Sequence, residues 1–483
     1  MASSVRVRFA PSPTGYLHVG GLRTALYNFL FARKNNGKFI LRIEDTDRAR
    51  YVDGAVEKLI DALHWAGIDY DEGPNKNGDV GPYIQSERLE IYRKHVEQLL
   101  QNGKAYHCFC ASERLEQMRK EMEAKKVDVK YDRTCLKLSE QEIQNNIEKK
   151  IPFVVRMKIP EHRTIAFHDI VRGDVEFQSD LIDDQVLLKS DGFPTYHLAV
   201  VVDDHLMEIS HVIRGEEWLS SVPKHLLLYE FFGWEVPQMA HLPLLLNPDK
   251  SKLSKRQGDV AVEDYRDKGY LKEALVNFVA LLGWNPGTEQ DIFSMEELIE
   301  QFSLERVHKS GAVFNLEKLN SLNATHLRKK SDEELLKILK DELAKSKFAG
   351  KHFADEYLLQ VVTAMRERVT FVKDFIEQSS YFFEAPTAYD ETAKAKNWKP
   401  ETSYQLKLLT AEFSKLENPK KEDYEIALHK TAQQLQIGNG KLIHGVRLAI
   451  SGVSGGPGLY DILSILGKEE SMKRIYTAIE TIK

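Results

Sequence analysis

A proline- and glycine-rich junction at residues 11–21, PSPTGYLHVGG, constrains this chain more than any other feature. It follows a short strand pattern at Val5–Phe9, and apolar residues then recur at helical spacing from Leu22 to Leu30. A second strand pattern at Phe39–Ile43 follows the helix. Because a strand, a helix and a strand in this order form a βαβ unit, we predict the opening of a doubly wound parallel sheet of the nucleotide-binding type.

The helix that follows this junction should begin close to Gly20. Its first N–H groups have no partner within the helix, and the helix dipole favours anions at this end. Gly20 and Gly21 allow a phosphate to approach the backbone closely, and His18 adds a side-chain donor. The junction therefore predicts a site for the phosphates of ATP. For so short a motif the alternative is a turn with a structural histidine.

A second phosphate-binding signal, KLSKR at residues 252–256, follows the apolar run Leu242–Leu246 and a turn at 247–249. Short basic runs usually lie on solvated faces, so this motif alone carries little weight. Its place on a loop that leaves a buried strand brings Lys252 and Lys255 to the edge of the predicted sheet. Two lysines there neutralise a leaving pyrophosphate, so the two motifs together predict ATP-dependent nucleotidyl transfer.

Both motifs belong to a longer series of matches that extends to about residue 320. The matching segments are APSPTGYLHVGG at 10–21, RIEDTDRARY at 42–51, EGP at 72–74, YIQSER at 83–88, LLKSDGFPTYHLAVVVDDH at 187–205, VIRGEEW at 212–218 and NPDKSKLSKR at 247–256. In this order and spacing the chain resembles the bacterial-type glutamyl-tRNA synthetases, a family of class I aminoacyl-tRNA synthetases. The resemblance implies a glutamate–tRNA ligase with an α/β, Rossmann-like catalytic domain, an α+β insertion and C-terminal all-α anticodon-binding domains.

The implied reaction has two steps. L-Glutamate reacts with ATP to give glutamyl-adenylate and pyrophosphate, and the glutamyl group is then transferred to the 3′-terminal ribose of tRNA(Glu). Mg²⁺ is expected to bind together with the ATP phosphates. The resemblance gives catalytic roles to His18, Lys252 and Lys255. It assigns glutamate binding to Arg8, Ala10, Ser12, Glu44, Tyr196 and Arg214, and ATP binding to His18, Gly20, Gly21, Trp218, Leu244 and Lys255.

Glutamate carries two carboxylates and one ammonium group, so its site needs cationic partners and an anion. The resemblance implies that Arg8 and Tyr196 hold the side-chain carboxylate. It further implies that Glu44 holds the ammonium group and Arg214 the α-carboxylate. Arginine suits these roles because its planar fork matches a carboxylate. The alternatives are a surface position for Arg8, an ion pair between Arg214 and a neighbouring glutamate, and core packing for Trp218.

All the cysteines of the chain fall within one short segment: Cys108, Cys110 and Cys135. A C-x-C pair with a third cysteine is typical of a zinc site, and Tyr131 or His107 is available as the fourth ligand. Some members of the family hold zinc here through cysteines and a tyrosine or a histidine, and Lys137 stands where that histidine is expected. We predict a structural Zn²⁺ site formed by Cys108, Cys110, Tyr131 and Cys135, with three reduced cysteines as the alternative.

The pattern also divides the chain into domains. The catalytic domain is predicted at 1–103 and 186–246, where Val186–Lys189 and Ala199–Asp203 are expected as strands of its sheet. Between these halves lies the α+β insertion at 104–185, which receives the acceptor end of the tRNA in the family. The KLSKR loop and a further unit follow at 247–325, and helical subdomains are predicted at 326–385 and 386–483. The resemblance implies that the unit contacts the tRNA stem and that the helical subdomains bind the anticodon.

Contacts with RNA are expected from a few residues, because a formal net charge of −6 excludes a generally basic surface. In the family an arginine of the helical part restricts the anticodon, and Arg366, Arg368 and Arg447 are the candidates. No apolar stretch is long enough to cross a membrane, and the N-terminus shows no apolar signal segment. We expect a cytoplasmic, monomeric enzyme whose partners are tRNA(Glu), ATP and L-glutamate.

The motifs leave other functions to be weighed. A form of the enzyme that also charges tRNA(Gln) stays open. A shorter glutamylating paralogue that modifies a tRNA base lacks the helical C-terminal third, so the length of this chain argues against it. A tRNA-binding protein without catalysis is disfavoured because the phosphate-binding and ammonium-binding residues are all present.

Overall fold

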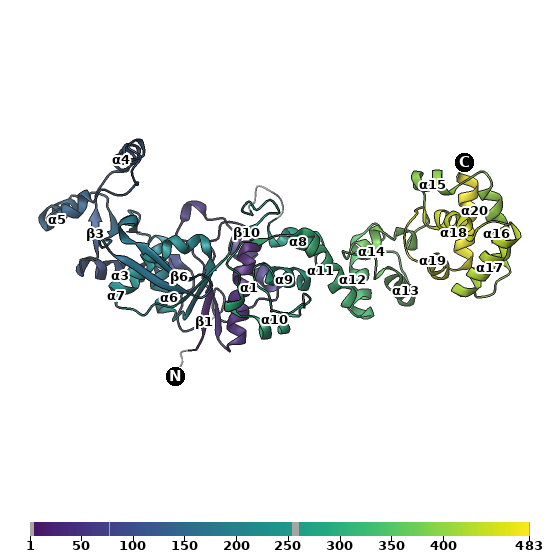
Figure 1. The fold of residues 1–483 in the computed structure, drawn as a ribbon, viewed down its shortest axis with the longest axis horizontal. Coiled ribbons are helices and arrows are strands. Elements are labelled where there is room, and N and C mark those ends of the chain that lie inside the picture. The colour runs from purple at the N-terminus through teal and green to yellow at the C-terminus, as the bar shows by residue number, and fades with distance from the viewer. Residues whose placement is uncertain (1–3, 77, 254–259, 483) are drawn as a thin grey trace. The chain divides into compact units, whose positions relative to one another are not determined.

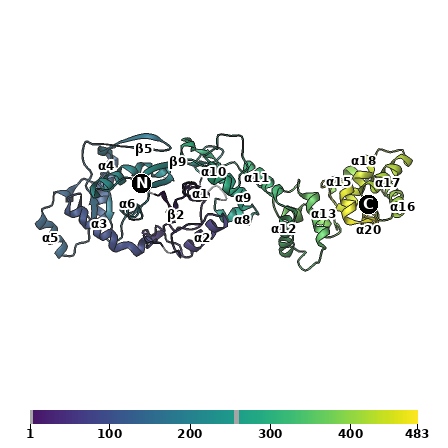
Figure 2. The ribbon, with the colours of Figure 1, turned by 90° about the horizontal axis from the view of Figure 1, so that it is seen from below.

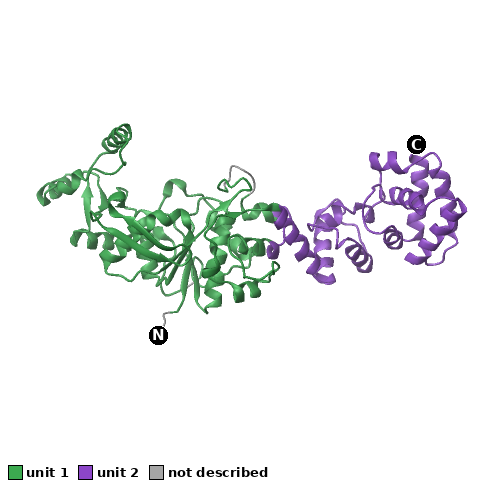
Figure 3. Ribbon diagram, viewed as in Figure 1, with its two compact units in different colours: residues 1–266, 275–316 green, residues 267–274, 317–483 purple. Residues whose placement is uncertain are grey.

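The computed structural model describes residues 4–76, 78–253 and 260–482. The chain divides into two compact units (Figure 3). Unit 1 comprises residues 1–266 and 275–316, and unit 2 comprises residues 267–274 and 317–483. The finer domain boundaries drawn from the sequence stay predictions. No helix among the described residues combines the length and the apolar character needed to cross a lipid bilayer.

The strands are β1 (Arg6–Phe9), β2 (Lys38–Leu41), β3 (Ala105–Cys108), β4 (Val154–Met157), β5 (Thr164–Asp169), β6 (Gly173–Gln178), β7 (Val186–Leu188), β8 (His211–Gly215), β9 (Gln238–Leu242), β10 (Leu245–Leu246) and β11 (Ala312–Val313). The first helices are α1 (Val19–Lys34), α2 (Ala55–Trp65), α3 (Leu89–Gln101), α4 (Ser112–Ala124), α5 (Glu140–Glu148), α6 (Tyr196–Leu206), α7 (Val222–Phe232), α8 (Val262–Asp267), α9 (Lys272–Ala280) and α10 (Met295–Gln301). They are followed by α11 (Leu316–Lys329), α12 (Asp332–Lys345), α13 (Asp355–Met365), α14 (Asp374–Glu377), α15 (Glu391–Asn397), α16 (Thr402–Ser414), α17 (Lys421–Gln434), α18 (Asn439–Ser451), α19 (Leu459–Leu466) and α20 (Lys468–Thr481).

Parallel strands form the centre of unit 1 (Figure 1). β1 pairs with β2, and β8 pairs with β9, both in parallel. The Ser210 N–H donates to the Arg6 carbonyl at 2.9 Å, so the start of β8 lies beside the start of β1. β5 then pairs in parallel with β9 and antiparallel with β6. All residues of β1 are buried, as expected for a strand covered on both faces, and the doubly wound α/β prediction is confirmed.

Helix α1 forms where the sequence predicts it, because its apolar residues share one face. Leu22, Leu26 and Leu30 are fully buried, and the helix contacts β1, β2 and β8. Basic residues occupy its last turn, where they complement the negative end of the helix dipole. The packing of α1 places its N-terminus at the carboxyl edge of the sheet, where the site lies.

The prediction of strands at Val186–Lys189 and Ala199–Asp203 within the catalytic sheet is wrong. Residues 199–203 lie in α6, and they are buried throughout. A continuous apolar run has the same pattern in a buried strand and in a buried helix, which explains the error. Residues 186–188 do form a strand, β7, but it pairs with β4 in the separate sheet β3-β4-β7. The central sheet resumes at β8.

The predicted α+β insertion at 104–185 contains α4, α5, β3, β4 and the hairpin β5–β6. β3 and β4 form an antiparallel sheet with β7, which follows the insertion, whereas the hairpin joins the central sheet. Both views place α4 and α5 at the opposite end of unit 1 from α10 (Figures 1 and 2). The part of the insertion that carries α4 and α5 is therefore an extension of unit 1 with a small sheet of its own.

Unit 2 is helical, as predicted, and a single apolar core extends through it. Leu339, Val361, Phe413 and Leu463 are among its fully buried members. The Arg474 guanidinium ties the bundle together by donating to the Tyr381 carbonyl at 2.6 Å and to the Ile450 carbonyl at 3.0 Å. A charged side chain buried among helices is tolerated here because backbone carbonyls accept its hydrogen bonds.

Candidate active site

A cavity of about 650 Å³ opens at the carboxyl ends of β1 and β8. Ligands bind at this edge in doubly wound sheets, because the helices that follow the strands begin there. The predicted residues that line the cavity are Arg8, Ala10, Ser12, His18, Gly20, Gly21, Glu44, Tyr196, Arg214 and Trp218. The fold therefore brings together residues that are far apart in the sequence.

His18 caps the N-terminus of α1 and lines the cavity. Its Nδ1 accepts a hydrogen bond from the Gly20 N–H at 3.0 Å. A neutral imidazole that accepts through Nδ1 carries its proton on Nε2, so the other side of the ring presents an N–H donor. A Cβ at position 20 would lie 3.3 Å from this Nδ1, a tight contact that glycine avoids. The ring and the first turn of α1 are arranged to bind an anion.

The segment that follows the second phosphate-binding signal lies beside the first signal. Residues 17–19 pair with residues 260–262 through backbone hydrogen bonds of 2.8 and 2.9 Å, so the chain that follows KLSKR returns along the first motif. Lys252 forms a bridge with Leu246 at the end of β10, and its side chain is exposed. Lys255 lies outside the described residues. The loop that carries Lys252 therefore starts and ends at structures close to α1.

A buried charge network lies behind the cavity lining and connects two of its residues, Arg8 and Glu44. The Arg8 Nε and Nη2 donate to the two oxygens of Asp204 at 3.0 and 3.2 Å. Arg42, which is fully buried, donates to the same Asp204 at 2.8 Å and to Glu44 Oε1 at 3.0 Å. These contacts fix Arg8 and Glu44 relative to each other, although they lie on different segments of the chain.

Burial raises the pKa of Glu44, although the charges of Arg42 and Arg8 oppose this shift. Its Oε1 accepts the hydrogen bond from Arg42, and the residue lines the cavity. A buried carboxylate whose charge is only partly balanced by arginines is stabilised when a second cation binds in the cavity. The geometry thus suits an ammonium ligand.

Arg214 is held by three side chains at the wall of the cavity. Its Nη1 donates to the Tyr196 hydroxyl at 2.9 Å and its Nε donates to His241 Nε2 at 3.1 Å. Its Nη2 donates to His225 Nδ1 at 3.3 Å. The Tyr196 ring lies 4.2 Å from the ring of Trp218, whose 38 % exposure places it at the cavity entrance rather than in the core. The alternative of core packing for Trp218 is therefore wrong.

The alternatives for the two arginines also fail. Arg8 is only 3 % exposed, so it is not a surface residue. Arg214 makes its contacts with the tyrosine and the histidines, whereas the neighbouring Glu216 pairs with Arg172. Leu244 lies outside the set of described residues that line the cavity, and its N–H donates to Glu216 at 2.8 Å. Its role in ATP binding stays a prediction.

Sequence reasoning missed several residues that hold the site in place: Arg42, Asp204, His225 and His241. Each is a polar residue next to an apolar run, for example His241 within MAHLPLLL and Asp204 after LAVVV. A polar side chain in a buried strand or helix needs a partner, and this requirement is the signal that identifies such residues.

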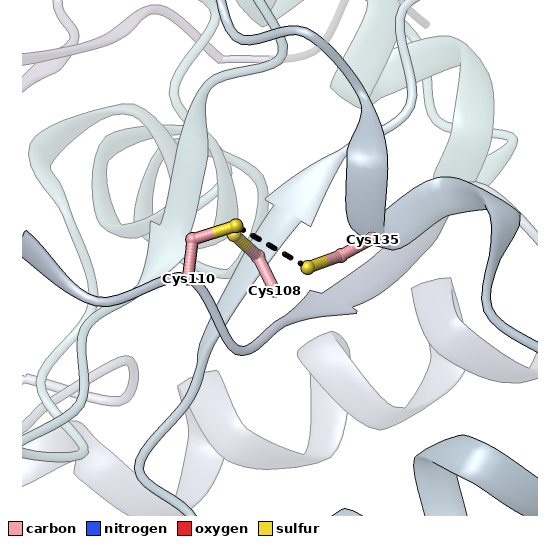
Figure 4. A group of neighbouring side chains, drawn as sticks. All are labelled: Cys108, Cys110 and Cys135. Carbon is pink, nitrogen blue, oxygen red and sulfur yellow. Dashed lines mark hydrogen bonds between the residues drawn. The ribbon is translucent and has the colours of Figure 1, made fainter. Parts of the chain in front are cut away.

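The cysteines form a second cluster in unit 1. Figure 4 shows the sulfur atoms of Cys108, Cys110 and Cys135 facing one another, and they all lie within 4.8 Å of one another. Cys110 Sγ is 3.4 Å from Cys135 Sγ and 3.2 Å from the Tyr131 hydroxyl. The His107 ring packs against Phe153 and is not part of this cluster. Three sulfurs and one phenol therefore converge as the predicted ligand set requires.

Two of the predicted anticodon-binding arginines act on one buried tyrosine in unit 2. Burial raises the pKa of Tyr381 to about 12, although the charges of Arg447 and Arg368 oppose this shift. The Tyr381 hydroxyl and Arg447 Nη1 are buried and have no hydrogen-bond partner among the described residues. Arg366 instead pairs with Asp332. The structure thus separates Arg366 from the other two candidates.

Comparisons with known families match both parts of the chain. Residues 4–321 match the catalytic domain of class I tRNA synthetases (E and Q), and residues 318–479 match an anticodon binding domain. The chain is 56% identical to the glutamate–tRNA ligase of Chloroherpeton thalassium over 494 residues, which cover 99% of this chain and 98% of that protein. It is 54% identical to the corresponding ligase of Chlorobium chlorochromatii, again over 99% and 98% of the two chains.

The fold is similar to solved structures over its whole length. A glutamate tRNA ligase from Elizabethkingia meningosepticum, solved in complex with its amino acid, matches with a TM-score of 0.94 and 44% sequence identity. The match covers 100% of both chains. The glutamate–tRNA synthetase of Elizabethkingia anophelis matches with a TM-score of 0.91 and 43% identity over 99% of this chain and 100% of that one.

Proposed function

The chain belongs to the glutamate–tRNA ligases of the class I tRNA synthetases, and on this premise we propose which of its residues bind glutamate, ATP and tRNA(Glu). The reaction joins L-glutamate to the 3′-terminal ribose of tRNA by way of glutamyl-adenylate. Neither step needs a nucleophilic side chain, because positioning of the reactants and stabilisation of phosphate charge lower the barrier. The residues of the cavity are of the kinds that such catalysis requires.

The proposal for glutamate binding depends on one observation, which is that Arg8, Arg214, Glu44 and Tyr196 line a single cavity. Their charges are complementary to the two carboxylates and the ammonium group of the substrate. We assign Arg8 and Tyr196 to the side-chain carboxylate. We assign Glu44 to the ammonium group and Arg214 to the α-carboxylate. Ala10 and Ser12, at the end of β1, line the space between them.

For ATP, we propose that the triphosphate binds at the N-terminus of α1. There His18 Nε2 supplies a donor, and Gly20 and Gly21 allow the phosphates to approach the backbone closely. Trp218 covers the nucleoside side of the cavity, and Lys252 and Lys255 neutralise the leaving pyrophosphate. Mg²⁺ bound to the phosphates would offset their charge. Its ligands would be phosphate oxygens, because Mg²⁺ prefers oxygen ligands. The group of potential metal ligands found among the described residues consists of cysteines.

The experiment that tests the amino-acid site compares Arg214→Gln with Arg163→Gln in ATP–pyrophosphate exchange in the presence of tRNA(Glu). Arg163 forms an exposed ion pair with Glu230, so its variant controls for the loss of one arginine charge. We expect Arg214→Gln to raise the KM for glutamate about 10- to 100-fold, with the KM for ATP unchanged. An unaltered KM for glutamate would refute the assignment.

We also propose a structural zinc ion at Cys108, Cys110, Tyr131 and Cys135. The spacing of the sulfurs and the direct contact of the phenol with Cys110 support a tetrahedral set. Protein purified without a chelator should contain about one zinc ion per chain, and Cys135→Ser should lose it. Tyr131→Phe should release zinc to a chelator faster than the exposed control Tyr404→Phe. Zinc-free wild-type protein would contradict this proposal.

For the tRNA, we propose Arg368 and Arg447 as the anticodon-binding pair. Their common proximity to Tyr381 and the pairing of Arg366 with Asp332 support this choice over Arg366. Arg447→Gln should raise the KM for tRNA(Glu) and leave glutamate activation unchanged, whereas Arg366→Gln serves as the control. Equal effects of both variants would contradict it.

The relatives carry the name glutamate–tRNA ligase, which gives the tRNA(Gln) alternative no support. The monomeric state and the cytoplasmic location stay predictions.

A further inference from the structure

Three polar side chains lie in a row across neighbouring strands below the cavity. Asp169 is on β5, His241 on β9 and Arg214 on β8, and Arg214 and His241 are direct partners in the parallel register. His241 Nδ1 lies 2.6 Å from Asp169 Oδ2, and His241 Nε2 lies 3.1 Å from Arg214 Nε. Asp169 and His241 are 0 % exposed. The row therefore connects the buried sheet to a residue of the cavity wall.

The donors and acceptors of this row allow one arrangement of protons. Arginine has donors and no acceptor, so His241 Nε2 must accept from Arg214. The imidazole proton is then on Nδ1 and is donated to Asp169. Asp169 Oδ1 is already occupied, because the N–H groups of Val171, Arg172 and His241 donate to it at 2.8 to 3.2 Å.

A second histidine holds the same guanidinium from helix α7. His225 Nδ1 accepts from Arg214 Nη2 at 3.3 Å, so its Nε2 carries the proton and donates to His197 Nδ1 at 3.1 Å. The Tyr196 hydroxyl accepts from Nη1 at 2.9 Å. Each nitrogen of Arg214 thus donates once to the protein. One N–H then remains on each terminal nitrogen, and these two can bind both oxygens of a carboxylate.

We propose that Asp169 and His241 are positioning residues, which set the imidazole tautomer that aims Arg214 at the α-carboxylate of glutamate. This inference rests on the assignment of Arg214 made above. Neither residue lines the cavity among the described residues, so both act through Arg214. Asp169 Oδ1 supports the backbone of the turn after β5, whereas Oδ2 faces His241 Nδ1, so the positioning role belongs to Oδ2.

Asp169→Asn tests the proposal because it keeps the shape of the side chain. Three N–H donors hold the amide oxygen at the Oδ1 position, so the amide nitrogen faces His241 Nδ1. His241 must then accept through Nδ1 and carry its proton on Nε2, where it opposes the Arg214 N–H. We expect the dissociation constant of L-glutamate to rise about 10- to 100-fold, with that of ATP unchanged.

A matched control exists in the same sheet. Asp174 pairs with His168 at 2.7 Å, but its side chain is 90 % exposed. Asp174→Asn therefore makes the same chemical change to an exposed aspartate–histidine pair, and we expect glutamate affinity within about twofold of wild type. NMR of full-length protein with ¹⁵N-labelled histidine should show the His241 proton moving from Nδ1 to Nε2 in Asp169→Asn only.

Two substitutions of His241 separate the role of Nε2, which accepts from Arg214, from that of Nδ1, which donates to Asp169. In His241→Gln the side-chain oxygen can occupy the position of Nε2 and accept from Arg214. In His241→Asn the shorter side chain can donate to Asp169 but leaves Arg214 without its acceptor. We expect His241→Gln to bind glutamate at least about tenfold more tightly than His241→Asn. Because this comparison is independent of Asp169, it decides the question if Asp169→Asn does not fold.

Failure of the inference differs from failure of the proposed function. If Arg214→Gln leaves glutamate affinity unaltered, the assignment of Arg214 is wrong. If Arg214→Gln weakens binding but the tautomer reverses in Asp169→Asn without any effect on glutamate, the positioning role is refuted. Equal affinities of His241→Gln and His241→Asn would refute it as well.

Discussion

The carboxylate of Asp204 holds the guanidinium of Arg8 through two hydrogen bonds, from Nε to Oδ1 at 3.0 Å and from Nη2 to Oδ2 at 3.2 Å. This contact occupies the Nε side of the arginine. Nη1 and one N–H of Nη2 then remain, so in the proposed site Arg8 would meet the substrate carboxylate end-on. Under that proposal, a residue outside the cavity lining sets the direction from which glutamate approaches.

Asp204→Asn should destabilise the protein by about 3–5 kcal/mol, because it leaves Arg8 and Arg42 buried without their anion. Burial would raise the pKa of Asp204, but Arg8 and Arg42 outweigh it and hold the pKa below its ordinary value of 3.8. A lowered carboxyl pKa contributes stability above the ordinary value, and this contribution is lost as the pH falls through the folded value. Urea denaturation checks both statements, with the exposed Asp174→Asn as control.

The outcome that contradicts this prediction is specific. If Asp204→Asn and Asp174→Asn have equal unfolding free energies at pH 7, the two arginines do not depend on Asp204. A difference that persists undiminished at low pH would show that the effect comes from packing rather than from charge.

Glu44→Gln should separate substrate binding from stability. The pKa of Glu44 is raised above its ordinary value of 4.5, so the folded protein binds more protons than the unfolded chain between the two values. Stability then falls as the pH rises through this window, and the glutamine variant avoids that loss. We expect Glu44→Gln to be as stable as wild type or more stable at pH 8, while the KM for glutamate rises about 10- to 100-fold.

Glutamate kinetics and urea denaturation of the same preparations test these two expected effects of Glu44→Gln. Glu57→Gln on the exposed face of α2 serves as the control. A variant with lowered stability at pH 8 and an unaltered KM would show that Glu44 supports the fold and does not bind the ammonium group.

Much of unit 1 could be predicted because its motifs combine local and functional constraints. The strand, the junction and α1 were predicted correctly, since the apolar spacing and the glycines each favour the same structure. Residues 199–203 were predicted wrongly as a strand, because a helix buried on all sides has no polar face to reveal its period. Periodicity identifies half-buried elements and fails for fully buried ones.

The pairing of side chains could not be predicted in the same way. Arg8, Arg42 and Asp204 come from β1, the segment after β2, and α6, and only the folded sheet brings them together. Arg366 and Arg368 are equivalent candidates in the sequence, yet the first is paired with Asp332 while the second acts on Tyr381. Both residues lie in the turn that follows α13, where no helical spacing indicates the direction of a side chain.

Tyr196→Phe should weaken glutamate binding without disturbing ATP. Burial raises the pKa of this tyrosine, so its hydroxyl stays protonated and can donate to a carboxylate while it accepts from Arg214. Removal of the oxygen eliminates both interactions, and we expect the KM for glutamate to rise about 10-fold or more. The exposed Tyr404→Phe is the control, and an identical KM in both variants would exclude a role for the hydroxyl.

In the proposed site His18 combines a structural contact with a catalytic one, and two substitutions can separate them. Asparagine is a good N-cap, and its oxygen can replace Nδ1 as the acceptor for the Gly20 N–H, but it has no donor at the position of Nε2. His18→Asn should therefore keep the stability of wild type and lower kcat about 10²- to 10³-fold, the usual effect of removing one donor to a transition-state anion. His18→Ala should lose a similar factor in kcat and, in addition, about 1 kcal/mol of stability. Pyrophosphate exchange and thermal unfolding of the two variants provide the measurements. A normal kcat in His18→Asn would show that the histidine acts only as a cap, because in that variant the contact with α1 is retained and only the donor is missing.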